Sequence, residues 1–211
     1  MAGQTPWQTI GPFFHYGLTW KGGADLVGNS TLGARPSLAP PENYVLADHV
    51  FGDRDRIVGE RIDIVGRVTD GDGLPVPDAM IEIWQADAAG RYAHPDDPGH
   101  SDADPSFIGF GRSATLEDGS FHFRTIRPGR VAGPGNTPQA PHIAVGVMAR
   151  GMLKRLTTRL YFADAPENVD DPILALVPPE RRNSLIARRE YGVWRFDVVL
   201  QGDGETVFFD C

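Results

Sequence analysis

Residues 61-RIDIVGRV-68, 69-TDGDGLPVPDA-79 and 80-MIEIWQA-86 decide the fold class of this chain. The first and third stretches alternate apolar and polar side chains, the period-two pattern of a strand with one buried face. The middle stretch holds two Asp-Gly pairs and two prolines, which are residue types of tight turns. A strand–turn–strand unit of this kind predicts an all-β architecture.

Alternation of the same kind recurs further along the chain. It is found in 119-GSFHFRTI-126, 142-HIAVGVMA-149, 156-LTTRLYF-162, 193-VWRFDVVL-200 and 206-TVFF-209. One segment, 179-PERRNSLIARRE-190, instead has a proline at its start and Leu185 and Ile186 on one side, as in a helix. Short strands separated by turns predict an antiparallel β-sandwich with long loops, here with one short helix in the C-terminal half.

The N-terminal region has a different character. Residues 1–20 are rich in aromatic side chains without a helical or alternating period, and residues 21–59 are rich in loop-forming glycine and proline. Leaving a large apolar side chain in water instead of burying it costs about 1.5–3 kcal/mol of free energy. The aromatic stretch is therefore expected to pack on another surface. We expect a single domain over residues 1–211, with an N-terminal arm and loops in 1–58 and the β-sandwich core in 59–211.

Composition narrows the class of partner. Of the 211 residues, 41% are hydrophobic and 23% charged, and the net charge is −8 without any basic run. An acidic chain is a poor match for phosphate backbones, so no nucleic-acid partner is expected. No apolar run approaches ~18 residues, so no membrane span is expected. The start lacks the pattern of a signal peptide and Cys211 is the one cysteine, which together predict a cytoplasmic protein.

Generic catalytic patterns are weak in this sequence. The six histidines include no pair at helical i, i+4 spacing, and neither a nucleophile elbow nor a P-loop is present. His94, Asp96, Asp97 and His100 share one loop and could bind a metal, although solvated polar loops are far commoner. In 140-APHIAVGV-147, His142 shares a strand face with Ala144, opposite the apolar face of the same strand.

Longer stretches resemble a known family. Residues 64-IVGRVTDGDGLPVPDAMIEIWQADAAGRYAH-94 resemble the first signature of the intradiol ring-cleavage dioxygenases. The similarity continues through 107-FIGFGRSATLEDGSFHFRTIRPG-129, then 141-PHI-143 and 157-TTRLYF-162. This resemblance implies ring cleavage of a catechol by dioxygen at a ferric iron, which the family holds with two tyrosinates and two histidines. Phenolate is a hard anionic donor that suits Fe(III), and imidazole completes the set.

The family's four ligand positions can be carried over one at a time. The resemblance places them at Tyr92 in 90-GRYAH-94, at Val131 in 128-PGRV-131, at His142, and at Ala144 two residues along the same strand. Valine and alanine have no donor atom, so two of the four ligands are missing. We therefore expect no catalytic iron in this chain alone and interpret the four positions as a vestige of the family's metal site.

Both ends of the chain resemble one member type of the family. In members built from two homologous chains, one chain has lost its iron ligands, and this type is resembled by 5-TPWQTIGPFFHYGL-18, 180-ERRNSLIARR-189 and 193-VWRFDVVLQGDGETVFFDC-211. The resemblance implies a homologous partner that carries the Fe(III), and assembly into a higher oligomer of both chains. It further implies that the arm reaches the partner's pocket, so that the following residues line a shared substrate site: Thr9, Gly11, Pro12 and Phe13.

Each of these residues also has a purely structural interpretation. The arm could pack on its own sandwich, Tyr92 could be a buried tyrosine with a backbone partner, and His142 a satisfied structural histidine. Arg112 and Arg124 are expected to form structural ion pairs. Two other function classes also remain: a single-chain dioxygenase whose missing ligands come from elsewhere, for example Tyr16 or His94, and a β-sandwich binding module without enzymatic activity.

Overall fold

The computed structural model describes Gly11 and residues 23–28, 30–33, 54–133, 135 and 137–210. Nine strands form within these residues: β1 Arg61–Thr69, β2 Met80–Trp84, β3 Phe110–Ala114, β4 Ser120–Ile126, β5 His142–Met148, β6 Leu156–Phe162, β7 Ile186–Glu190, β8 Val193–Arg195 and β9 Val198–Val199. The helices of the described chain are all short 3-10 helices: η3 Arg54–Arg56, η4 His100–Asp102, η6 Pro166–Asp170, η7 Leu174–Leu176 and η8 Pro179–Leu185. The all-β class is thereby confirmed.

The strands form one continuous path in the order β3-β2-β5-β6-β7-β8-β1-β4, with β9 beside β1. The predicted sandwich is not confirmed, because β7 pairs with β6 on one side and with β8 on the other and so joins the two halves of the path. The antiparallel prediction is also only partly right, because β1 pairs in parallel with β8 and β9, and β6 with β7. The sheet is therefore mixed, with the parallel pair of β6 and β7 at the centre of the path.

The two halves of the strand path enclose the larger of two clusters of buried apolar side chains in the described residues. Its side chains come from β1 and β4 (Ile64, Phe123) and from β2, β5 and β6 (Ile81, Ile143, Leu160), and all five are at most 1% exposed. The alternation read from the sequence decides which face turns inward, because a one-residue slip would move every side chain to the other face. On the opposite face of these strands, Tyr161 of β6 packs in a second, smaller apolar cluster with Leu174 and Leu185.

A segment of the N-terminal region lies between the two edge strands. Residues 23–28 and 30–33 accept hydrogen bonds from Arg112 and Ala114 of β3 and exchange two with Arg124 of β4. Ala24, Leu26 and Val27 add to the core. Exposed strand edges invite association with other chains, so this segment protects both ends of the path.

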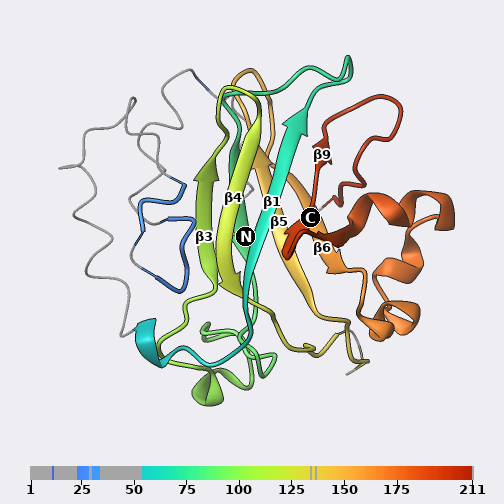
Figure 1. Ribbon diagram of the computed structural model, residues 1–211. Helices are drawn as coiled ribbons and strands as arrows, with labels where there is room; N and C mark the ends of the chain where they lie inside the picture. Colours follow the sequence, from blue (N-terminus) through green and yellow to red (C-terminus); the bar gives the residue numbers. More distant parts are fainter. Residues whose placement is uncertain are drawn as a thin grey trace, which may run out of the picture.

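The C-terminal half contains the predicted short helix, but with different bounds. The helix η8 ends at Leu185, and residues 186–190 form β7 instead of a further helical turn. Ile186 and Ala187 pair with Tyr161 and Phe162 of β6, and this tertiary pairing outweighs the local helical pattern. The short helices between Pro166 and Leu185 gather beside β6, to the right of the strands in Figure 1.

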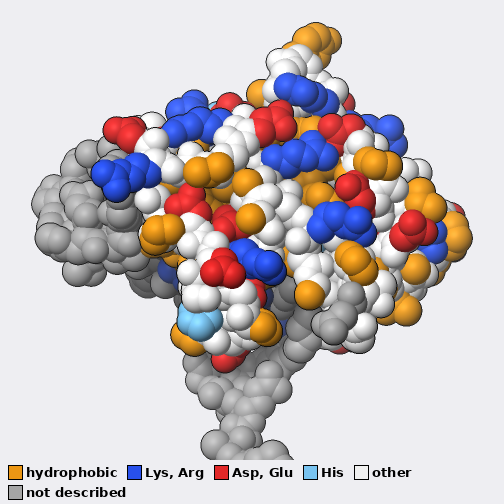
Figure 2. Space-filling view, turned by 90° about the horizontal axis from the view of Figure 1, so that it is seen from below, with side chains coloured by type: hydrophobic (Ala, Val, Ile, Leu, Met, Phe, Trp, Pro, Cys, Tyr) orange, Lys and Arg blue, Asp and Glu red, His pale blue; other side chains and the backbone are white. Residues whose placement is uncertain are grey.

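The surface carries both signs of charge. On the face shown in Figure 2, basic and acidic side chains are interspersed, so no extended field of one sign forms on that face. Across the residues that the structure describes, no helix has the length and apolar character needed to span a bilayer.

Candidate functional site

The outer face of β2, β5 and β6 carries the candidate site. Trp84 lies opposite Ala144, which in turn lies opposite Arg159, and His142 lies opposite Tyr161. Directly paired residues of neighbouring strands point to the same side of a sheet. These five side chains therefore share one face, opposite the core face formed by their sequence neighbours.

Tyr92 is held over this face by the loop that follows β2. Its ring stacks on the indole of Trp84 with centroids 5.9 Å apart and planes 6° apart. Its backbone N–H donates to Oδ2 of Asp97 at 2.7 Å, which fixes the loop. Tyr92 is half-buried. Burial raises the pKa of its hydroxyl, although the charge of Arg159 acts in the opposite direction, so the phenol is neutral at neutral pH.

Val131 and Tyr92 line the same hollow, which has a volume of about 490 Å³. The hollow is also lined by Trp84, His94 and Ala132. The structure thus brings together the two positions that the resemblance assigns to tyrosinate ligands. The side chain at one of them is an 8% exposed valine.

The side chain of His142 is 5% exposed, and one of its ring nitrogens has a hydrogen-bond partner. Its Nδ1 lies 2.8 Å from the carbonyl oxygen of Ala140, and its ring lies 5.7 Å from that of Tyr161. Burial, with a smaller contribution from Arg159, lowers its pKa to about 4. The histidine is therefore a neutral, partnered side chain, as its structural reading predicts.

The four carried-over positions do not suit a ferric ion. Val131 and Ala144 offer no donor atom, which leaves only the phenol oxygen of Tyr92 and one ring nitrogen of His142. A mononuclear iron needs more than two protein donors to fix its geometry, and an anionic donor to favour Fe(III). These four positions alone thus do not provide a full set of ligands for the family's metal.

The loop that contains His94, Asp96, Asp97 and His100 forms hydrogen bonds within itself. Asp97 accepts from Tyr92 and Gly99, and Nδ1 of His100 lies 3.0 Å from the carbonyl oxygen of Asp97. His94 Nδ1 accepts the backbone N–H of Asp96. Within the described ranges, three or more His, Cys, Asp or Glu side chains nowhere gather in a way that could hold a metal ion. The hydrogen bonds of these side chains stabilise the conformation of the loop.

The two arginines singled out in the sequence form ion pairs, as predicted. Arg112 Nε lies 2.6 Å from Glu82 Oε1, and Arg155 binds the other oxygen of Glu82 at 3.0 Å. Arg124 Nε lies 3.4 Å from Asp63 Oδ1. These pairs hold neighbouring strands together on the outer faces of the sheet.

Of the predicted arm residues, Thr9, Pro12 and Phe13 lie outside the described residues, as does Tyr16 of the single-chain alternative. Gly11 is described and is exposed. The shared-pocket prediction therefore stays a prediction.

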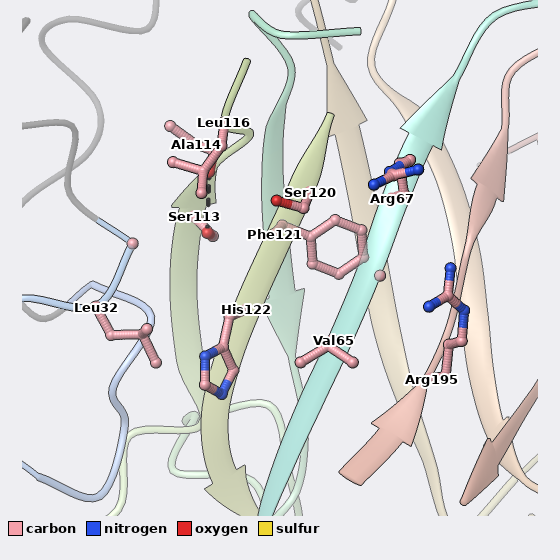
Figure 3. Close-up of a pocket in the computed structure, with 12 residues that line it drawn as sticks. Leu32, Val65, Arg67, Ser113, Ala114, Leu116, Ser120, Phe121, His122 and Arg195 are labelled. Atoms are coloured by element: carbon pink, nitrogen blue, oxygen red, sulfur yellow. Dashed lines mark hydrogen bonds between the residues drawn. The ribbon is translucent and has the colours of Figure 1, made fainter. Parts of the chain in front are cut away.

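A second hollow, of about 360 Å³, lies on the outer face of β1 and β4 (Figure 3). His122 and Arg195 line it, but each has an acidic partner: Asp63 at 2.7 Å and Asp197 at 2.8 Å. None of the positions predicted from the sequence lies there. The hollow on the Trp84 side is therefore the candidate site.

The lowered pKa of His142 implies that the free energy of unfolding decreases in acid. A histidine whose pKa falls from about 6.5 unfolded to about 4 folded stabilises the fold above pH 6.5 and loses that contribution as the pH falls toward 4. Between pH 7 and pH 4.5 we expect the wild type to lose about 2–3 kcal/mol more unfolding free energy than His142→Gln. Urea unfolding at both pH values measures this; equal losses would contradict it.

Comparison with known proteins finds related chains over most of the sequence. A family model described as Dioxygenase matches residues 40–202. The chain is 45% identical to the protocatechuate 3,4-dioxygenase alpha chain of Burkholderia cepacia, over 98% of this chain and 97% of that one. It is 38% identical to the beta chain of the same organism's enzyme, over 71% and 68%.

A solved structure shares the fold. Catechol 1,2-dioxygenase from Acinetobacter sp. ADP1 superposes with a TM-score of 0.57 at 25% identity, over 74% of this chain and 57% of that one. About three quarters of this chain thus share a fold with a chain whose sequence agrees at one position in four. The described fold, the family model and the near full-length similarity together show that this chain belongs to the intradiol dioxygenase family.

Proposed function

We propose that this chain is the alpha subunit of a protocatechuate 3,4-dioxygenase and that it binds no iron itself. The near full-length similarity to an alpha chain supports the assignment, and so does the similarity to a beta chain. The single observation that carries it is the pair Val131 and Ala144, two apolar side chains at positions where the family needs ligands.

In this proposal the Fe(III) is bound by a homologous beta subunit. The assembled enzyme opens protocatechuate with O2 to 3-carboxy-cis,cis-muconate, as part of aromatic catabolism in the cytoplasm. When bound, the iron supplies activation of the catecholate ring toward dioxygen. The alpha chain contributes surface: it completes the substrate pocket and builds a higher alpha–beta oligomer, through permanent interfaces of about 2,000 Å² or more.

The arm is the part of this chain that we propose to meet the substrate. Gly11 allows close approach of the backbone, Pro12 stiffens it, and Phe13 offers an apolar wall to an aromatic ring. Thr9 completes the segment. The exposure of Gly11 is compatible with a role at an interface.

One observation favours a second candidate, a single-chain intradiol dioxygenase with substituted ligands. His94 lies in the same hollow as Tyr92, with its ring 6.2 Å from that of Trp84. It could in principle replace one missing imidazole, whereas the valine position would still lack a donor. A binding module without enzymatic relatives has less support, because the similarity to an alpha chain extends over 98% of this chain.

Variants of the arm test the shared pocket in the assembled enzyme. The chain is co-expressed with a homologous beta chain, and the complex is isolated and assayed by oxygen uptake with protocatechuate. Gly11→Val is expected to lower kcat/KM about ten- to a hundredfold, because a misplaced wall disturbs the substrate's orientation. Gly3→Val, in the same arm but outside the proposed pocket, is the matched control and should leave kcat/KM unchanged.

The same experiment can refute the proposal in two ways. Wild-type KM and kcat in the Gly11→Val complex would remove the arm from the substrate pocket. Failure of the two chains to co-purify would reject the role as a subunit.

A further inference from the structure

The turn between β7 and β8 holds an aromatic residue in a backbone conformation that such residues rarely adopt. Glu190 pairs with Val193, so Tyr191 and Gly192 form a two-residue hairpin loop. Tyr191 has φ 49° and Gly192 has φ 90°, the signs of a type I′ turn. Among the described residues, Tyr191 is the only one other than glycine with a positive φ. Asparagine, aspartate and glycine are favoured at this position, because a bulky side chain is strained there.

The strained side chain makes no contact that would account for its place in the turn. Tyr191 is fully exposed, and within the described part of the chain it forms neither a hydrogen bond nor a ring contact. All residues from 188 to 192 are exposed. An aromatic ring in water forgoes the free energy of burial, and the turn adds strain to that loss. Burial in a partner chain would account for both, as it does for the aromatic anchors of protein interfaces.

The hairpin carries positive charge close to its tip. Arg188 and Arg195 lie directly opposite each other on the two strands, and like charges in that arrangement destabilise a sheet. Asp197 binds Arg195 at 2.8 Å, whereas the described residues provide no carboxylate partner for Arg188 or Arg189. Three arginines and Glu190 give residues 188–195 a net charge of +2, in a chain whose net charge is −8. The hairpin is therefore suited to an acidic surface.

The hairpin lies at the end of the sheet that carries the candidate site. The strands β2 and β6 both pair with β5 in the antiparallel sense, so they run in the same direction and finish at the same end. Trp84, the last residue of β2, stacks there on Tyr92. The strand β7 begins in parallel beside Tyr161, which is opposite His142, and continues in that direction past the end of β6.

The symmetry of a pair of homologous chains brings the partner to this same end. Homologous chains that pair around a two-fold axis use equivalent surfaces on both sides. In the proposed function the arm of this chain reaches the iron site of the beta chain. The equivalent place in this chain, the hollow that contains Tyr92 and Val131, then faces the beta chain as well. The tip of the hairpin approaches the partner from the same end of the molecule.

We propose that Tyr191 anchors the interface with the beta chain by inserting into a pocket of that chain whose rim carries carboxylates. The floor of the pocket buries the ring, and the carboxylates pair with Arg188 and Arg189. Arginine binds carboxylates with two parallel hydrogen bonds, which select the partner as well as add affinity. The strained turn holds the ring ready, so little conformational entropy is lost when it binds. The identity of the partner rests on the proposed function.

Competition for a limiting amount of beta chain tests the anchor. The wild-type chain and one variant, with different tags, are co-expressed with a homologous beta chain. The alpha chains captured with the beta chain are counted by mass spectrometry and corrected for expression. Tyr191→Asn removes the ring and suits the turn, whereas Tyr191→Phe keeps the ring. Leu153→Asn is the matched control, because Leu153 is 64% exposed and lies in the turn between β5 and β6, at the opposite end of the sheet.

We expect Tyr191→Asn to be captured about tenfold less than the wild type, the effect of losing an anchor residue. Tyr191→Phe and Leu153→Asn should be captured within about twofold of the wild type. Arg189→Glu should also be captured about tenfold less at low salt, and its loss should shrink at about 1 M salt, where charges are screened.

Two outcomes separate this inference from the proposed function. Equal capture of Tyr191→Asn and the wild type would overturn the inference and leave the subunit function standing. If the beta chain captured no wild-type chain, the subunit function would be rejected and the inference with it.

Urea unfolding of the full chain alone distinguishes an anchor from a structural residue. Tyr191→Asn should raise the urea midpoint, because asparagine is favoured in this turn, whereas replacing a residue that supports the fold lowers the midpoint. A lower midpoint together with lower capture would overturn the proposal, since the variant would then bind less because it is less folded. Self-association of the chain alone that is lost in Tyr191→Asn, with capture unchanged, would assign the hairpin to a second copy and equally overturn it.

Discussion

Replacing Asp171 with alanine is expected to lower the free energy of unfolding by about 3–5 kcal/mol, because several buried donors lose their acceptor together. Asp171 is fully buried. Its carboxylate accepts from the backbone N–H groups of Ala140 (2.8 Å), Ile173 (2.9 Å) and Leu174 (2.7 Å), and from the hydroxyl of Tyr161 (3.1 Å). It therefore joins the segment before β5, the strand β6 and the start of η7.

Asp171→Asn is the matched control. Asparagine keeps one acceptor oxygen in the same place, but its amide group turns a donor toward donors. Denaturant unfolding should therefore rank the wild type above the asparagine variant and the asparagine variant above the alanine variant. A loss below about 1 kcal/mol for alanine would contradict the role of this carboxylate.

Gly90→Ala is expected to destabilise the fold by about 2–5 kcal/mol. Gly90 has φ +78°, a region that alanine adopts with strain, and an added Cβ would overlap the carbonyl oxygen of Arg130. The close approach of these two loops holds Tyr92 and Val131 in one hollow. The variant should therefore also disturb the Tyr92–Trp84 stack, which tryptophan fluorescence reports.

Gly73→Ala separates the two causes. Gly73 has nearly the same φ, +77°, but an added Cβ would meet nothing within 4 Å. Its replacement should cost only the backbone strain, about 1 kcal/mol. Equal losses of unfolding free energy at the two positions would show that contact with Arg130 contributes nothing.

Period-two alternation was sufficient to locate five of the strands. The stretches 61–68, 80–86, 119–126, 142–149 and 156–162 all coincide with strands, because each has one face in the shared core. The strand β3 was missed, since 110-FGRSA-114 has little alternation and is defined by pairing with β2. Residues 206–209 are not a strand; Phe209 makes a single bridge to Thr157.

The candidate site was only partly predictable. The positions Tyr92, Val131, His142 and Ala144 could be named from the resemblance, and Val131 and Tyr92 do share a hollow. Arg159 was not singled out, because its place opposite Ala144 comes from the register of β5 against β6, which a single sequence does not specify. The signal that could have found it is an arginine on the histidine-facing side of 157-TTRLYF-162.

Iron content and oxygen uptake test the central claim most directly. The chain is purified alone and, in parallel, together with a homologous beta chain that carries all four ligands, and both samples are assayed with protocatechuate. The account predicts neither stoichiometric iron nor oxygen uptake from the chain alone, and both from the complex. Stoichiometric iron with full ring-cleaving activity from this chain alone would contradict it.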